Sequence, residues 1–411
     1  MAIKQMQTKL FDFSDEGLNF CVASKALFPD RFKKMLAQGY NVQTVTGVSV
    51  SGDQVTLMYG GAHGYVAERV LKVDSGALSF INGGEFYIDS VTTNSVTLTI
   101  EDAPVSVPSG FTTRIASLGW SLEYESGLVQ LYKMRYLDER DCYVRFVFST
   151  PGVNGKSLVN VCIGKTANLS AGEITDSYSL DTCRNNTSIV TGFVLGFTSS
   201  NHQPSTDSYT YSQGLSVYGK ACVVGSMYHL AFLTGAGTTD NSGRILGIFP
   251  AHTFDFEAID YPLVLGCTIA SITSTTAVEL AQGEAGDLGR IGNIRVAFTG
   301  GTSTSTAISS GNSISSFLPN DIQGEQTTTA FHLQIYEHTT RQFIGYGLGL
   351  YSLNYNSGAS NRPSPSPANS PSETYDIDLE SLIKIHTLST ARSSTSIQYF
   401  AVPVEEIKIG T

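Results

Sequence analysis

Short runs of alternating apolar and polar residues, separated by turn-forming residues, recur along most of this chain. Residues 41–61 alternate on both sides of a Ser-Gly-Asp turn at 51–53, which predicts a β-hairpin. An Asn-Gly pair at 82–83 lies between two β-prone runs and predicts a second hairpin. A third turn is expected at Thr93-Asn94. Residues 42–101 therefore predict a compact β-meander.

The middle and last thirds of the chain continue in the same way. Short β-branched or aromatic runs, each bounded by Gly, Asn, Ser or Pro, predict strands of a β-sandwich resembling a jelly roll. We expect a mostly β fold of several antiparallel β-sandwich or β-meander domains with one or two short helices. The expected domains are residues 1–110, with the meander and one helix, residues 111–260, with the sandwich, and residues 261–411, a third β domain with mobile loops.

Helix signals are few. In the segment 28–39, Pro29 is placed for a first helical turn and Gly39 for a C-cap, while Phe32, Met35 and Leu36 share one face. This segment predicts a helix. A second helix is expected from Asp376 to His386.

Two insertions in the last third are poor in large apolar residues. Residues 299–316 are rich in Ser, Thr and Gly and carry no charge, and residues 357–375 contain four prolines. Neither can bury enough apolar surface to offset the entropy lost on ordering, so both are expected to order only against a neighbouring subunit.

Composition narrows the function. Charged residues make up 15% of the chain and the net charge is -11, whereas a general nucleic-acid binder would carry a basic surface. The six cysteines form no C-x-x-C pair and are interpreted as buried free thiols of a reducing cytoplasm. No signal peptide is visible and no apolar run is long enough to cross a membrane, so we expect no membrane insertion.

Candidate sites for chemistry are sparse. His252, Asp255 and Glu257 are close in sequence, but in a strand the two acids would face away from the histidine, so no metal site is predicted. His63 lies between glycines and is interpreted as part of a turn, because no helix N-terminus follows it to bind phosphate. The spaced glycines at 283–292 predict an irregular loop.

Two other patterns bear on sugars. Gly345, Gly347 and Gly349 alternate along one predicted strand, which allows another backbone or a flat ring to approach closely. Close packing against another sheet or subunit is the favoured interpretation, and a sugar-binding face is the alternative.

The carboxylate pairs Glu123 with Glu125 and Glu405 with Glu406 have the residue type that a glycosidase needs, but no aromatic-lined pattern accompanies them. No catalytic, cofactor-binding or metal-binding residues are therefore predicted.

Three features together resemble the virion proteins of tailed bacteriophages: the run from Arg69 to Ile100, the cysteine-poor composition rich in Ser, Thr, Gly and Asn, and the uncharged insertions. The resemblance is one of style over the whole chain and assigns no functional residue. It implies a protein made in the bacterial cytoplasm and built into a symmetric assembly of the virion.

The expected function is a non-enzymatic structural component of the tail, baseplate or neck, which binds other virion proteins and copies of itself. Alternatives are a host-binding tail fibre or adhesin that recognises a bacterial surface glycan, with exposed aromatic residues around Tyr346, Tyr351 and Tyr355, a capsid decoration protein, and a polysaccharide hydrolase. The absence of shaft-forming repeats favours a component of the tail, baseplate or neck over a fibre.

Overall fold

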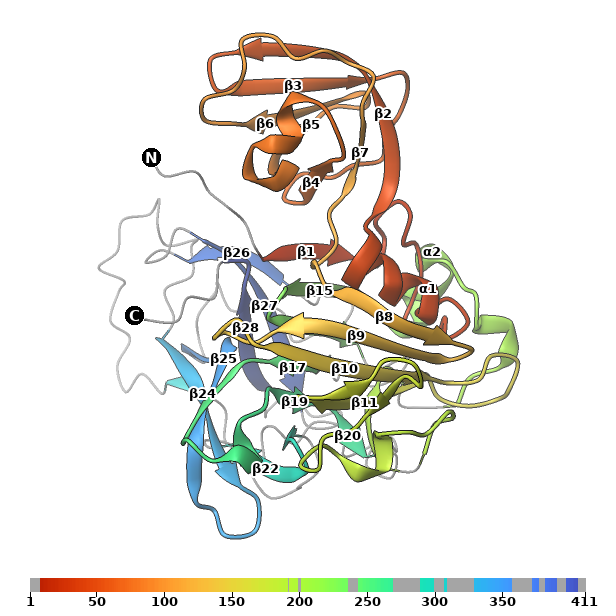
Figure 1. Cartoon of the computed structure of the whole chain (residues 1–411), viewed down its shortest axis with the longest axis vertical. Helices are drawn as coiled ribbons and strands as arrows, with labels where there is room; N and C mark the ends of the chain where they lie inside the picture. The colour runs from red at the N-terminus through yellow and green to blue at the C-terminus, as the bar shows by residue number, and fades with distance from the viewer. Residues whose placement is uncertain are drawn as a thin grey trace.

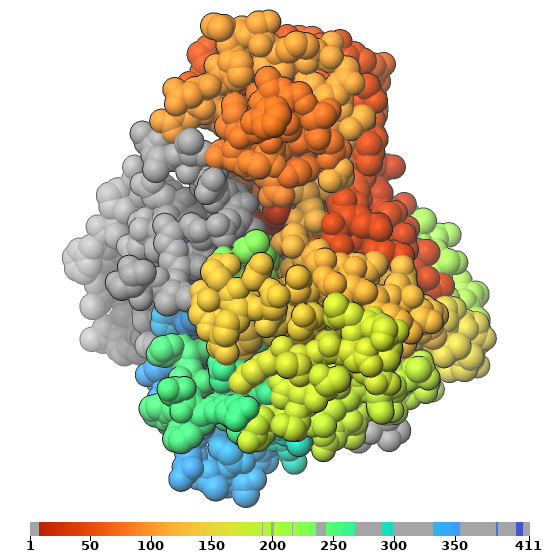
Figure 2. Space-filling model, in the orientation of Figure 1, coloured from red at the N-terminus to blue at the C-terminus, as the bar shows by residue number. Residues whose placement is uncertain are grey.

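The computed structural model describes residues 8–190, 192–198, 201–235, 243–268, 289–298, 307–308, 329–356, 372–376, 381–389 and 397–405. In these residues the chain is mostly β and its strands pair almost entirely antiparallel, so the predicted fold class is confirmed. A small barrel forms a lobe above a larger body (Figures 1 and 2). No helix in the described ranges is long and apolar enough to cross a membrane.

The barrel closes in the order β2-β3-β6-β5-β4-β7. Its strands are β2 (Tyr40–Ser51), β3 (Gln54–Tyr59), β4 (Val70–Val73), β5 (Glu85–Val91), β6 (Ser95–Thr99) and β7 (Thr112–Ile115). The predicted turns at 51–53 and 93–94 are confirmed by the pairs Ser51 with Gln54 and Val91 with Val96. The predicted meander is wrong, because β3 lies beside β6 and β7 closes the barrel between β4 and β2.

The hairpin predicted at Asn82-Gly83 is also wrong. The run before it forms the 3-10 helix η2 (Ala77–Phe80), and the pair itself lies in the 3-10 turn η3 (Asn82–Gly84). Both residues have the positive φ angles expected of an Asn-Gly turn, 48° and 62°. Leu78 is the buried residue of η2. The segment therefore packs against the core through Leu78 and the half-buried Ile81 and does not pair as a strand.

The body contains two large sheets. The first has the order β20-β14-β11-β10-β9-β8. Its strands are β8 (Ser121–Ser126), β9 (Val129–Arg135), β10 (Asp141–Phe148), β11 (Leu158–Gly164), β14 (Phe193–Gly196) and β20 (Cys267–Thr268). A separate two-stranded sheet joins β12 (Ala167–Asn168) to β13 (Glu173–Ile174), near the 3-10 turn η4 (Asp181–Cys183).

The second sheet follows the order β1-β15-β16-β17-β19-β21-β22-β24-β25-β28-β27-β26, with β18 and β23 beside β25. Its strands are β1 (Lys9–Asp12), β15 (Ala221–Ser226), β16 (His229–Gly235), β17 (Gly243–Phe249), β18 (Ala251–Thr253), β19 (Leu263–Leu265), β21 (Gly289–Ile291), β22 (Ile294–Phe298), β23 (Ala307–Ile308), β24 (Thr329–Glu337), β25 (Phe343–Asn356), β26 (Ser372–Asp376), β27 (Ser381–Ser389) and β28 (Ile397–Pro403).

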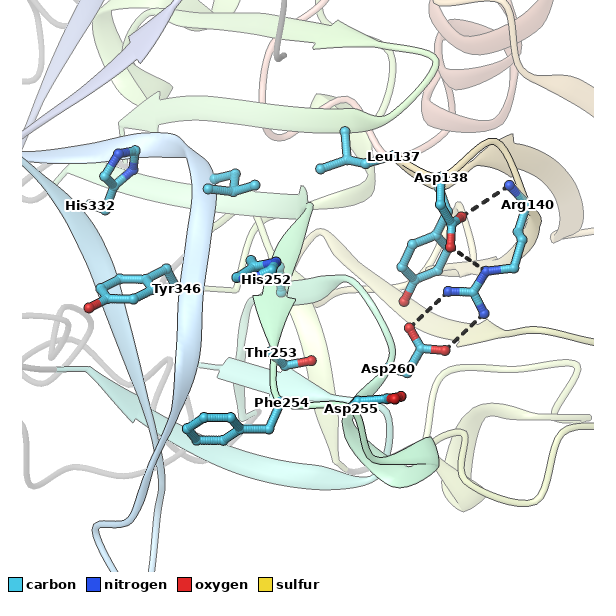
Figure 3. A pocket seen from close by; sticks show the side chains of 13 residues that line it. Leu137, Asp138, Arg140, His252, Thr253, Phe254, Asp255, Asp260, His332 and Tyr346 are labelled. Carbon is cyan, nitrogen blue, oxygen red and sulfur yellow. Dashed lines mark hydrogen bonds and ion pairs between the residues drawn. The ribbon is translucent and has the colours of Figure 1, made fainter. Parts of the chain in front are cut away.

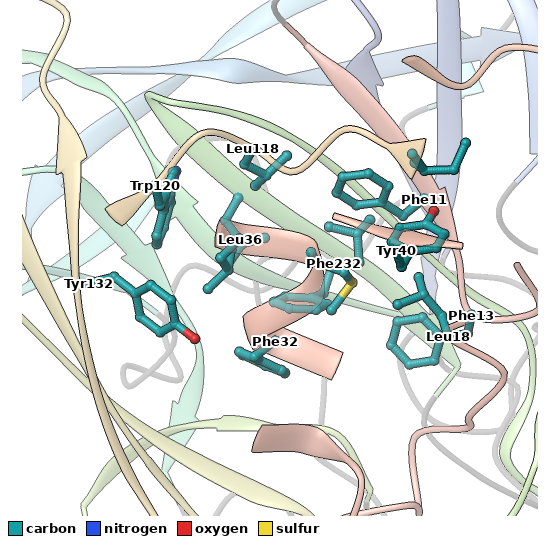
Figure 4. Packing of buried hydrophobic residues seen from close by; sticks show 14 of the residues in the cluster. Phe11, Phe13, Leu18, Phe32, Leu36, Tyr40, Leu118, Trp120, Tyr132 and Phe232 are labelled. Carbon is teal, nitrogen blue, oxygen red and sulfur yellow. The ribbon is translucent and has the colours of Figure 1, made fainter. Parts of the chain in front are cut away.

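The predicted N-terminal helix is confirmed. It comprises α1 (Phe28–Lys33) and a π-helical continuation, η1 (Lys34–Gln38), and Gly39 ends it with a φ of 75°. Phe32 is fully buried between the two sheets, with ring centroids 5.4 Å from Phe146 of β10 and 5.2 Å from Phe232 of β16. Figure 4 shows Phe32 and Leu36 of the helix with Phe232, Trp120 and Tyr132 around them. The apolar face predicted for this helix is thus the centre of the core.

The helix predicted at 376–386 is wrong, because most of this segment forms β27, which pairs with β26 on one side and β28 on the other. Alternating β-branched residues at Ile383, Ile385 and Thr387 favour a strand. A second helix, α2 (Tyr211–Tyr218), was not predicted. Thr210 and Gln213 form a capping box at its start, a signal that the sequence does contain.

The three expected domains remain a prediction. Strand pairing crosses both expected boundaries, since β1 pairs with β15 and β20 pairs with β14. The two low-complexity insertions lie mostly outside the described residues, apart from β23 and β26. All six cysteines are buried free thiols, as predicted.

A buried ion pair joins the barrel to the body. Arg69, directly before β4, donates two hydrogen bonds to the carboxylate of Asp15, which follows β1, at 2.9 and 3.0 Å. The hydroxyl of Tyr40, at the start of β2, donates to the same carboxylate at 2.7 Å. Burial lowers the pKa of Arg69, but the charge of Asp15 outweighs burial and the pKa is raised overall. The guanidinium therefore stays charged in a site closed to water.

Replacing one partner of this pair should be strongly destabilising. In Arg69→Met the carboxylate of Asp15 stays buried without its cation, which costs about 3–5 kcal/mol of unfolding free energy. Urea unfolding measures the loss. Arg135→Met is the matched control, because Arg135 and Asp141 form an exposed pair at 2.8 Å that contributes at most about 1 kcal/mol. Equal losses in the two variants would contradict this role.

A buried histidine gives the fold a pH dependence. His229, in β16, is fully buried, with Nδ1 2.8 Å from the hydroxyl oxygen of Ser226. Burial lowers the pKa of His229 to about 3. Between this value and the ordinary 6.5, the unfolded chain binds a proton that the folded chain does not. This contribution to stability is complete above pH 6.5 and is lost as the pH falls towards 3.

His229→Gln should flatten the pH profile of stability. Between pH 4 and 6 the unfolding free energy of the wild type should rise more steeply than that of the variant, by up to about 1.4 kcal/mol per pH unit. Urea unfolding at several pH values measures both slopes. His202, whose pKa is also lowered by burial, is present in both proteins and cancels in the difference. Equal slopes would show that His229 does not titrate on unfolding.

Candidate functional site

A groove of about 630 Å³ opens in the body where three segments meet (Figure 3). The first is the turn between β9 and β10, the second is β18 with the loop after it, and the third is β24 with β25. The lining residues are Tyr136, Leu137, Asp138, Arg140, Ala251, His252, Thr253, Phe254, Asp255, Asp260, His332, Tyr346 and Leu348. Its volume lies within the range of about 300–1,000 Å³ common for ligand sites.

The glycines of β25 position one wall of the groove. β18 pairs with β25 on one side, Thr253 opposite Gly345, and β24 pairs with it on the other. Gly345 has a φ of 153°, and a Cβ atom there would collide with the carbonyl oxygen of His252. The glycine does allow another backbone to approach closely, but that backbone is β18 of the same sheet, not another sheet or subunit as the favoured interpretation had it. Because the two backbones lie so close, Phe254 and Tyr346 are brought to the same wall.

Two exposed aromatic rings form that wall. The side chains of Phe254 and Tyr346 are 53% and 39% exposed. Both contact the ring of Phe343 edge to face, at centroid distances of 6.0 and 5.0 Å. Phe343 also contacts Tyr336 of β24 at 5.6 Å. The exposed rings are thus supported from below in defined orientations.

The opposite wall is an ionic network. Arg140 donates to both carboxylate oxygens of Asp260 at 2.9 Å each and to Asp138 at 2.5 Å. Lys165, just outside the groove, lies 3.0 Å from Asp260. The hydrogen bonds from Arg140 are the largest cause of the lowered pKa of Asp260, so this carboxyl group stays ionised. The charges of this wall are already paired with one another.

The residues singled out from the sequence are only partly brought together. His252 and Asp255 both line the groove, whereas Glu257 lies in the 3-10 turn η6 (Glu257–Ile259) and does not. The expected strand face shared by Asp255 and Glu257 is wrong, because β18 ends at Thr253. No three metal-ligating side chains gather in the part of the chain that the structure describes.

The remaining candidates lie elsewhere. His63 is buried in a loop of the barrel, where its ring accepts a hydrogen bond from the backbone N–H of Tyr65 at 2.9 Å. Glu125 binds Lys33 at 2.6 Å, and Glu123 lies 4.0 Å from Lys133. The predicted loop at 283–292 and Glu406 fall wholly or partly outside the described residues.

The aromatic patch expected around Tyr346 has a different composition. Tyr346 is exposed and lines the groove, but Tyr351 is half-buried beside His332, with centroids 4.9 Å apart. The side chain of Tyr355 is not among those described. Sequence reasoning missed Phe254, Arg140 and Asp260. The charged run at 138–141 was a visible signal, but its partner Asp260 is 120 residues away.

No known protein family matches the chain, and no characterised protein matches it in sequence. The side chains of the groove carry three kinds of chemistry. The groove offers aromatic faces on one wall, a fixed polar surface on the other, and the exposed carboxylate of Asp255 between them.

The ionic wall can be tested by titration. In Arg140→Met, the pKa of Asp260 should rise, because its principal hydrogen-bond donor is lost while Lys165 remains. Carboxyl ¹³C NMR between pH 2 and 6 measures this value. Asp176, whose carboxylate accepts a hydrogen bond from Tyr261 at 2.7 Å, is the internal control and should not change. An unchanged Asp260 would mean that Arg140 does not hold this carboxylate in solution.

Proposed function

We propose that the chain is a non-catalytic structural component of a tailed-phage virion, in the tail, baseplate or neck, assembled in the bacterial cytoplasm. In this role it binds other virion proteins and copies of itself. The proposal rests on the resemblance in sequence style and on one structural observation, the apolar side chains exposed on the barrel.

These side chains are concentrated in one part of the described chain. Of the eleven large hydrophobic residues that are exposed in the described parts of the chain, five lie within the barrel region: Val42, Met58, Val66, Phe80 and Val105. Phe80 is 89% exposed and Val105 is 98% exposed. Burying a Val or Phe side chain is favourable by about 1.5–3 kcal/mol. Covering such side chains with a partner would therefore be favourable, which supports a contact made through this lobe on assembly.

The closed barrel suits such a contact. Its six strands satisfy one another, so it presents no open edge for unspecific pairing. The Asp15–Arg69 pair holds it on the body. A partner would therefore be recognised by side chains such as Phe80 on a fixed lobe, which favours specific assembly.

Other virion roles lead to different results in one experiment. A gold-labelled antibody against this chain, applied to particles of the phage that encodes it, should label the tail, baseplate or neck. Label over the capsid would favour the decoration protein. Label at fibre tips would favour the host-binding alternative. Intact particles that lack the chain would overturn the proposal.

Assembly through the barrel should depend on its exposed apolar side chains. Phe80→Ser combined with Val105→Ser should lower the mass of the purified oligomer, because the apolar area buried in the contact is lost. Light scattering over a range of protein concentrations measures that mass. The folded structure should be unchanged, since both residues are exposed.

Val153→Ser is the matched control, because Val153 is 55% exposed but lies in the body. It should assemble like the wild type. A wild type that remains monomeric at every concentration, or a double variant that assembles normally, would contradict self-assembly through this surface.

A further inference from the structure

The groove between the β9–β10 turn and β25 combines a supported aromatic wall with a polar one. Figure 3 shows Tyr346 and Phe254 on one side of it and Asp138, Arg140 and Asp260 on the other. We infer that this groove is a binding site for a neutral oligosaccharide. The sugar rings stack on Tyr346 and Phe254, and their hydroxyl groups donate hydrogen bonds to Asp255.

The aromatic wall selects a ligand with flat apolar faces. Exposed rings with one free face bind the C–H face of a sugar ring by dispersion and by their negative π-surface. Phe343 contacts both Tyr346 and Phe254 and fixes their orientation before a ligand arrives. Less conformational entropy is therefore lost on binding than with free side chains.

The polar wall excludes a purely apolar ligand. Asp138, Asp260 and Arg140 line one side of the groove and would lose water without gaining partners if a hydrocarbon covered them. Sugar hydroxyl groups both donate and accept hydrogen bonds, so they can replace that water. The fixed geometry of the Arg140–Asp260 pair gives those hydroxyl groups defined partners.

Charge selects a neutral ligand over an anionic one. The lining carries three aspartates and one arginine, a formal charge of -2 with histidine neutral. A polysaccharide with carboxylate or phosphate groups would be repelled at short range.

A cationic peptide is also disfavoured. Asp138 and Asp260 are already paired with Arg140, and Lys165 adds a second cation beside Asp260. Within the described part of the chain, Asp255 is the carboxylate of the groove that forms no ion pair. One free acceptor suits hydroxyl donors better than a string of cations.

The inference goes beyond assembly and does not depend on it, because the groove lies in the body and the exposed apolar residues Phe80 and Val105 lie in the barrel region. Loss of sugar binding would leave the mass of the oligomer unchanged. Loss of assembly by Phe80→Ser with Val105→Ser would leave sugar binding unchanged. The two proposals can therefore fail separately.

Calorimetric titration of the full chain tests the inference. The probes are maltohexaose, cellohexaose and chitohexaose as neutral ligands, hexagalacturonate as the acidic ligand and hexalysine as the cationic one. At least one neutral hexasaccharide should bind, with an affinity that does not change between low and high salt. Hexagalacturonate should not bind, and hexalysine should bind more weakly than the neutral ligand.

Variants locate the site. Tyr346→Ala and Phe254→Ala should each weaken binding of the neutral hexasaccharide about tenfold or more, a change of about 1.4 kcal/mol. Phe256→Ala is the matched control, since Phe256 is 66% exposed, two residues from Phe254, and does not line the groove. Its affinity should stay within twofold of the wild type.

Three results would overturn the inference. One is the failure of all three neutral hexasaccharides to bind. Another is binding that Tyr346→Ala and Phe254→Ala leave unchanged. The third is tighter binding of hexalysine or hexagalacturonate, with an affinity that falls as salt is added, which would assign the groove to a charged partner. Because the replaced side chains are exposed, thermal unfolding should confirm that each variant is folded.

Discussion

The arrangement of this molecule depends on the buried contact between Asp15 and Arg69. Asp15 follows β1, which pairs with β15 of the body, and Arg69 precedes β4 of the barrel. The guanidinium and the hydroxyl of Tyr40 share one carboxylate. Desolvating both charges costs free energy, and the bidentate geometry together with the hydrogen bond from Tyr40 offsets that cost. Such a contact tolerates little displacement, so it fixes how the barrel sits on the body.

The barrel and the body can therefore contact a partner in different ways. The barrel is closed, so a partner can contact only its side chains, among them the almost fully exposed Phe80 and Val105. The body keeps two open sheets, and within the described residues their end strands pair on one side only: β8 and β20 in one sheet, β1 and β26 in the other. It also carries the groove, whose walls come from segments far apart in the sequence. A protein that assembles through one lobe and binds a ligand through the other would need this separation.

The sequence predicts the elements whose signals are local. Pro29, Gly39 and the spacing of Phe32 define the first helix within a dozen residues, and the turn at 51–53 is equally local. The segment 376–386 was expected to form a helix, but most of it pairs with β26 on one side and β28 on the other and is therefore a strand. The closure of the barrel was not predicted either, because β7 and β2 are about seventy residues apart in the sequence and no local pattern encodes their pairing.

The groove was also not predictable from local patterns, because its walls come from segments far apart in the sequence. Gly345 and its neighbours signalled a close approach, and that approach is what places Phe254 of one segment beside Tyr346 of another. The sequence did not indicate which backbone would approach the glycine. It also did not indicate that Asp260 would form an ion pair with Arg140. A replacement of Gly345 would therefore act on the groove indirectly: a side chain there would push β18 from β25 and separate the two rings. The glycine contributes to the site through backbone geometry, without contacting a ligand itself.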